Sequence, residues 1–200
     1  MSSIIDKPLG RQGFEVIKEQ IGAILATELE NQKQLQDFNL PINVFLDRQN
    51  PFDNSENLMF NVGLRSYQKE NKSQNSTHVT ATYSIDVFVS TKQNNANRGD
   101  VISTNIRDRY IGLVDSILSS TKYFRLLYET PFLMGTMVTN VQTYEPQNEM
   151  DAKFVSMSRL TFEVRYSENY DNWDGMPFSS MFTDVRLDLT ENGYKYELSS

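Results

Sequence analysis

The chain has 200 residues, of which 38% are apolar and 12% aromatic, which suits one folded domain with a sizeable core rather than a disordered chain. Its 19 basic and 26 acidic residues give a net charge of -7, and no dense lysine or arginine run offers a grip on a nucleic-acid backbone. The absence of cysteine excludes disulfides, thiolate metal sites and cysteine nucleophiles.

The start of the chain lacks the basic region and apolar core of a signal peptide. The longest mostly apolar run, residues 132–138, is far shorter than the ~20 residues of a membrane span. We therefore expect a protein without membrane contact, in a reducing compartment.

Two amphipathic helices are predicted, at about residues 12–35 and 101–120. In each, apolar residues recur at spacings of three and four along one stripe, while charged residues fill the other faces. The stripes are Phe14, Ile17, Ile21, Ile24, Leu25 and Leu29 in the first, and Val101, Ile106, Tyr110, Leu113, Val114, Ile117 and Leu118 in the second. Since each stripe is one-sided, we expect both helices to pack on a sheet.

A half-buried strand is predicted over residues 77–91, where apolar and polar residues alternate strictly. One face carries Val79, Ala81, Tyr83, Ile85, Val87 and Val89. The other face is polar, with Thr80, Thr82, Ser84 and Asp86. A preceding strand at 58–65 is expected to form a long antiparallel hairpin with it through a polar tip at 68–76.

Further strands are predicted at 41–47, 132–144 and 154–166, the last two paired with each other. Residues 124–129 fit either a short strand or an extended connector, and 145–151 read as a loop. A change of face around Ser158 predicts either a bulge or coverage of the strand's first half from the opposite side.

These elements predict an α+β fold: a mostly antiparallel, twisted sheet with two helices packed on it, over residues 1–168. Residues 169–200 lack regular periodicity at first and then contain Asn192-Gly193, a turn signal between two alternating runs. We expect a C-terminal arm that carries a small hairpin and docks on its own domain or on a neighbouring chain.

Reaction chemistry has little support in the sequence. His78 is the single histidine, so neither a two-histidine metal site nor a histidine relay can form within one chain. The acidic stretch 171–175 lacks the later glutamate of a calcium loop, and we expect a tight turn there. Glu145, Glu149 and Asp151 form a polar loop in which burial would not raise a carboxyl pKa. We expect no catalytic residue, metal or cofactor.

Two sets of residues are candidates for a subunit interface. Five large apolar residues of the arm either complete the local core or pack onto another subunit: Trp173, Met176, Phe178, Met181 and Phe182. The polar strand face of Thr80, Thr82, Ser84 and Asp86 has no evident covering element in its own chain.

The order of elements, together with the stretches Gly13–Ile21 (GFEVIKEQI) and Thr82–Val89 (TYSIDVFV), resembles tail-terminator, or tail-completion, proteins of long-tailed bacteriophages. The resemblance spans residues 12–166 and rests on pattern and topology. The long arm after Tyr166 departs from it.

The resemblance implies a structural protein of the virion tail or neck, assembled in the host cytoplasm. Such proteins form a ring, commonly of six copies, that caps the tail tube protein and joins it to the head-side connector protein. DNA passes through the lumen without specific binding, which a net negative charge suits. Alternatives are another neck or baseplate adaptor of the same particle, and a small ligand-binding or enzymatic α+β domain.

Overall fold

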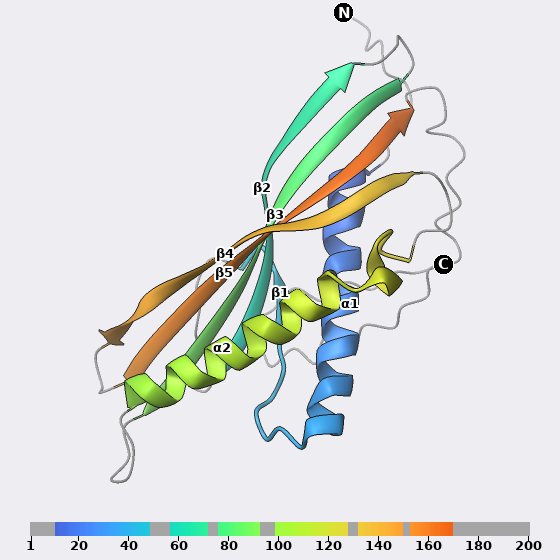
Figure 1. Ribbon diagram of the computed structural model, residues 1–200. Helices are drawn as coiled ribbons and strands as arrows, with labels where there is room; N and C mark the ends of the chain where they lie inside the picture. The colour runs from blue at the N-terminus through green and yellow to red at the C-terminus, as the bar shows by residue number, and fades with distance from the viewer. Residues whose placement is uncertain are drawn as a thin grey trace, which may run out of the picture.

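In the residues that it describes, the computed structural model contains two α-helices and a five-stranded sheet (Figure 1). This confirms the predicted α+β fold with a mostly antiparallel, twisted sheet and two helices packed on it. The residues that the structure describes are 11–48, 57–71, 76–92, 99–127, 132–149 and 153–169. Apart from Asn169, the predicted C-terminal arm lies outside these residues.

The strands stand in the order β1-β2-β3-β5-β4, so the longest-range pairing joins β3 to β5 at the centre of the sheet. Only β1 and β2 are parallel; the other neighbours are antiparallel. The elements are α1 (Gly13–Gln36), β1 (Val44–Leu46), β2 (Leu58–Asn71), β3 (Ser76–Lys92), α2 (Gly99–Leu118), a 3-10 turn (Thr121–Tyr123), β4 (Leu133–Glu149) and β5 (Lys153–Asn169).

Both predicted helices are confirmed to within two residues, but several loops were wrongly predicted. The expected hairpin tip at 68–76 is shorter, because β2 runs to Asn71 and β3 begins at Ser76. The expected loop at 145–151 is largely strand, since β4 continues to Glu149. Residues 124–127 are neither strand nor extended connector but a tight turn after the 3-10 helix.

The predicted change of covering at Ser158 is wrong, and the nearby irregularity is a bulge on the partner strand β4, between Tyr144 and Gln147. The strand β5 pairs with β3 without a register shift, and Ser156 and Ser158 are buried on the same face as Leu160 and Phe162. Ser156 and Ser158 are small enough to lie on the core side, so the polarity of these residues does not indicate which face of the strand is buried. The register shifts lie instead in the β2–β3 and β4–β5 pairings.

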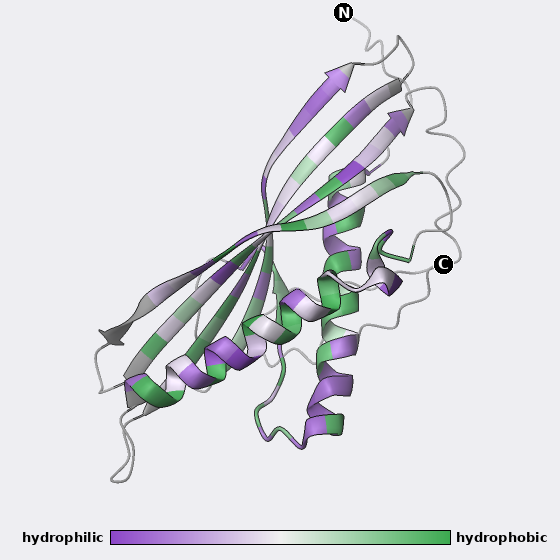
Figure 2. Ribbon diagram, in the orientation of Figure 1, coloured by the Kyte–Doolittle hydropathy of each residue, from purple (hydrophilic) through white to green (hydrophobic). Residues whose placement is uncertain are grey.

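The core lies between the helices and one face of the sheet. The predicted apolar face of β3, from Val79 to Val89, is buried, and both helices contribute to the same cluster. From α1 these are Ile17, Ile21, Ile24, Leu25 and Leu29, and from α2 they are Tyr110, Ile111, Val114 and Leu118. Figure 2 shows polar and apolar segments alternating along the strands, as expected when one face is buried.

Close backbone packing fixes the start of α1 across β3 and β5. The backbone amide of Gln12 donates to the Glu15 carboxylate (2.9 Å), which caps the helix. The Tyr83 hydroxyl donates to the carbonyl of Phe14 (2.9 Å). A Cβ at Gly13 would lie 2.5 Å from the Tyr166 ring, so this approach requires glycine.

A carboxylate of α1 holds the 3-10 turn that follows α2. Glu28 accepts hydrogen bonds from the Lys122 ammonium (2.8 Å) and from the Tyr123 hydroxyl. These bonds, that from Lys122 first, lower the pKa of Glu28 below its ordinary value. A lowered folded-state pKa means that the stabilisation is complete above the unfolded-state pKa and is lost as the pH falls through the folded-state pKa.

We therefore expect Glu28→Gln to lower the free energy of unfolding by about 1 kcal/mol at neutral pH. The difference from the parent chain should shrink as the pH falls below the ordinary carboxyl pKa of 4.5. Urea unfolding across this pH range measures it. Glu30→Gln is the matched control, because Glu30 pairs only at the helix surface with Lys33. If the loss of unfolding free energy in Glu28→Gln stayed the same in acid, the stabilisation could not be assigned to the ionised Glu28 carboxylate.

Candidate functional site

One face of the sheet is turned away from both helices, and we call it the open face. On β3 it carries His78, Thr80, Thr82, Ser84, Asp86 and Phe88, which alternate with the core residues. Opposite them on β5, the register places Met157, Arg159, Thr161, Glu163, Arg165 and Ser167. The open face is therefore mostly polar and comes from strands that are distant in sequence.

An ion-pair network occupies the centre of the open face. The Asp86 carboxylate is only 4% exposed and accepts two bonds from Arg159, from Nε (2.7 Å) and from Nη2 (2.9 Å). Arg65 approaches the same carboxylate through Nη2 (3.4 Å) and donates from Nε to the Ser84 hydroxyl (2.8 Å). A two-pronged arginine–carboxylate pair of this kind offsets the cost of burying the charge.

Arg65 lies at a β-bulge of β2. Leu64 pairs with Tyr83 and Ser66 pairs with Thr82, so Arg65 is an extra residue on β2. The bulge changes which positions of β2 face the core: Leu64 packs on the core before it, and Tyr67 stacks on Phe14 after it. The alternation from Leu58 to Leu64 by itself turns Arg65 to the open face, and the bulge changes the alternation only beyond Arg65.

The network is electrostatically unbalanced. Hydrogen bonding to Asp86 raises the pKa of Arg159 above its ordinary value, so its guanidinium keeps its charge. Two guanidinium groups against one carboxylate leave a local charge of +1 in a chain whose net charge is -7. The side chains of Arg65 and Arg159 are 48% and 30% exposed. They can therefore donate hydrogen bonds to a carboxylate or carbonyl of a partner.

The predicted interface residues fall into two groups. Ser84 and Asp86 come together in the network, and Thr80 and Thr82 lie half-buried on the same face. The expectation that no part of the chain covers this face was wrong for Ser84 and Asp86, because Arg65 and Arg159 cover them. The apolar arm residues Trp173, Met176, Phe178, Met181 and Phe182 lie outside the described residues.

Sequence reasoning missed both arginines. Arg159 is marked by its place on the polar side of an alternating strand, but its pairing with Asp86 depends on the β3–β5 register. Arg65 follows Leu64 on the polar side of an alternating strand, but its approach to Asp86 depends on the β2–β3 register.

The residues considered for chemistry do not converge. His78 lies on the open face at the end of β3 opposite Glu70 and Ser167, remote in sequence and register from Asp86. The stretch 171–175 and Asp151 lie outside the described residues, as do the side chains of Glu145 and Glu149. Among the described residues, no group of three or more histidine or carboxylate side chains is arranged to hold a metal ion. No helix in the described ranges is long and apolar enough to cross a membrane.

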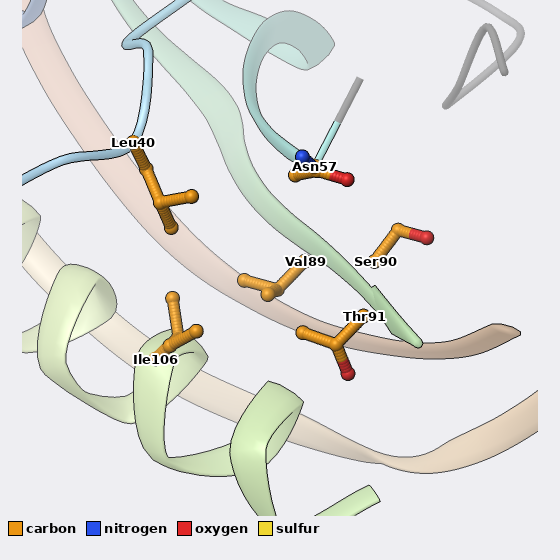
Figure 3. Close-up of a pocket in the computed structure, with 6 residues that line it drawn as sticks. All are labelled: Leu40, Asn57, Val89, Ser90, Thr91 and Ile106. Atoms are coloured by element: carbon orange, nitrogen blue, oxygen red, sulfur yellow. The ribbon is translucent and has the colours of Figure 1, made fainter. Parts of the chain in front are cut away.

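A shallow depression of about 330 Å³ lies between α2 and the end of β3 (Figure 3). Leu40, Val89 and Ile106 supply most of its apolar lining, while Thr91 lies at its edge. Asn57 and Ser90 complete it, and no charged side chain lines it. An open hollow of this composition has no convergent polar groups to orient a small molecule.

Comparison with known proteins leaves the family open. No protein-family model matches the chain, and no curated protein matches it. Among solved structures, one chain known only by a sequence identifier matches with a TM-score of 0.45 and 12% identity, covering 74% of this chain and 96% of that chain. A likeness at this level carries no functional argument, so the open face has to be interpreted from its own residues.

The network on the open face should be detectable in stability. We expect Asp86→Asn to lower the free energy of unfolding by about 2 kcal/mol, because it leaves two arginines without their shared counter-charge. Glu163→Gln, on the same face of β5, should change it by no more than about 0.5 kcal/mol. Urea unfolding at neutral pH compares the two variants. Equal losses of unfolding free energy in the two variants would show that the pairing of Asp86 with the arginines does not stabilise the fold specifically.

Proposed function

We propose that this protein is a structural subunit of a bacteriophage tail, a ring-forming tail terminator. In this role, several copies close a ring, commonly of six, that caps the tail tube protein and offers a surface to the head-side connector protein. The subunit has no enzymatic function and needs no cofactor. It resides in the tail or neck of the virion after assembly in the host cytoplasm.

The observation that carries the proposal is the one-sided covering of the sheet. Both helices pack on one face, whereas the open face carries partly exposed arginines around a buried carboxylate. A polar face with charged groups held in fixed positions suits a specific and hydrated contact between subunits. The proposal places Thr80, Thr82, Ser84 and Asp86 in or beside this contact.

The specific place in the tail comes from the resemblance of residues 12–166 to tail terminators. The net charge of -7 supports it, because a lumen wall of this sign lets DNA pass without being held. Another neck or baseplate adaptor would use the same open face. Electron microscopy of particles that carry a labelled copy separates the alternatives by showing the label at the head-proximal or the distal end of the tail.

Ring formation is the first test. Native mass spectrometry of the full chain should show a single oligomer of fixed copy number. Adding the protein to growing tail tubes should stop their elongation. Arg65→Glu reverses the charge of a partly exposed group and should dissociate the ring, whereas Glu70→Gln at the end of the same strand should not. A strictly monomeric protein at high concentration, without affinity for tail tubes, would reject the proposal.

The arm supplies a second test. We expect a chain that ends at residue 168 to remain folded, because both helices and nearly all of the five-stranded sheet precede that point. Its assembly into rings should be impaired. Circular dichroism and native mass spectrometry distinguish the two effects. An insoluble or unfolded truncated chain would mean that residues 169–200 belong to the core.

A further inference from the structure

Exposed apolar side chains are concentrated at one corner of the molecule. Of the eight large apolar residues that are exposed in the described ranges, five lie between residues 124 and 141. Three of them surround the start of β4: Phe124, Leu127 and Met134, with exposed fractions of 50%, 55% and 41%. We call these three residues the apolar corner.

The three residues are held together by the chain around them. The Phe124 ring lies over Gly135, where a Cβ would be 3.2 Å from the ring, and Gly135 directly follows Met134. The Thr136 hydroxyl donates to the Phe124 carbonyl (3.2 Å), which fixes the turn on β4. Leu127 follows in the same turn. Phe124 and Leu127 thus belong to one turn, and this turn is joined to β4 within two residues of Met134.

The backbone is strained where it presents Leu127. Leu126 and Leu127 have φ angles of 48° and 65°, the left-handed region that leucine seldom adopts. Leu126 is buried, and its carbonyl accepts a hydrogen bond from the Gln20 side-chain amide (3.0 Å). The next residue, Leu127, is exposed. A fold that strains its backbone to expose a leucine is consistent with a surface that is covered by another segment.

The last described residues of β5 lie beside this corner. Tyr166 pairs with Leu133, and the Ser167 amide donates to the Phe132 carbonyl (3.0 Å). From Ser167, the six residues to Trp173 can extend about 20 Å, whereas Met134 is only two residues, or about 7 Å, from Phe132. The 31 residues after Asn169 therefore begin within reach of the corner.

We propose that residues 173–182 of the same chain dock on the apolar corner. This segment carries Trp173, Met176, Phe178, Met181 and Phe182, whose apolar surface matches that of the corner. The docked segment completes the core locally and leaves the open face as the surface for other subunits. The proposal does not depend on ring formation, since it concerns one chain.

The chain contains no cysteine, so introduced pairs report proximity without background. Leu127→Cys is combined in the full chain with Met176→Cys or with Phe178→Cys and oxidised at low protein concentration. Val101→Cys is the matched control, because Val101 is also apolar and 52% exposed but lies about 26 Å along α2 from Leu118. Mass spectrometry and non-reducing gels identify the disulfide as internal to one chain or between chains.

We expect at least one Leu127→Cys pair to form an internal disulfide in several-fold higher yield than the same arm cysteine with Val101→Cys. Equal yields, or disulfides that join two chains, would overturn the proposal. A second measurement uses trypsin, whose sites in the arm include Arg186 and Lys195. Leu127→Asp should accelerate their cleavage about tenfold, and Val101→Asp should leave the rate unchanged.

The tenfold change is the scale expected from losing one leucine from a packed contact, about 1.4 kcal/mol. Circular dichroism confirms that Leu127→Asp retains the described fold. A rate of arm cleavage that is the same in Leu127→Asp as in the parent chain would also reject docking at this corner.

Discussion

The helix-side face of β3 is the constraint on which the rest of the molecule depends. Every second residue from Val79 to Val89 is buried under the helices. Because side chains alternate between the two faces of a strand, the position of a residue in this alternation decides whether it lies in the core or on the open face. A slip by one residue would bring Asp86 into the core and expose Tyr83. The hydrophobic effect therefore fixes the register, and the register in turn brings Asp86 opposite Arg159.

The polar network is a consequence of that register and also reinforces it. Arg159 on β5 and Arg65 on β2 reach the same carboxylate from the two strands that flank β3. Since the carboxylate is buried and both guanidinium groups reach solvent, the network joins the interior of the sheet to its surface. The open face can thus hold charged groups in fixed positions without a covering helix.

The sequence predicted most of the fold because β3 and both helices have clear periodicity. It did not predict the lengths of β2 and β4, because their outer parts are polar on both faces and resemble loops. It misjudged Ser158 because a small residue beneath α2 can be buried without being apolar. Asp86 was identified as a candidate, but its partners could not be, since they depend on the register of β2 against β3 and on pairing across 73 residues.

The bulges of β4 have a consequence for solubility. This strand has 17 residues and forms an outer edge of the sheet, where unpaired amides and carbonyls could template the addition of further strands. Its pairing with β5 shifts register at three places, near Met134, Thr139 and Pro146, which divides the edge into short runs. Such interruptions hinder a second chain from pairing along the whole strand. The first of these irregularities lies at Met134, so it interrupts the edge strand beside the apolar corner.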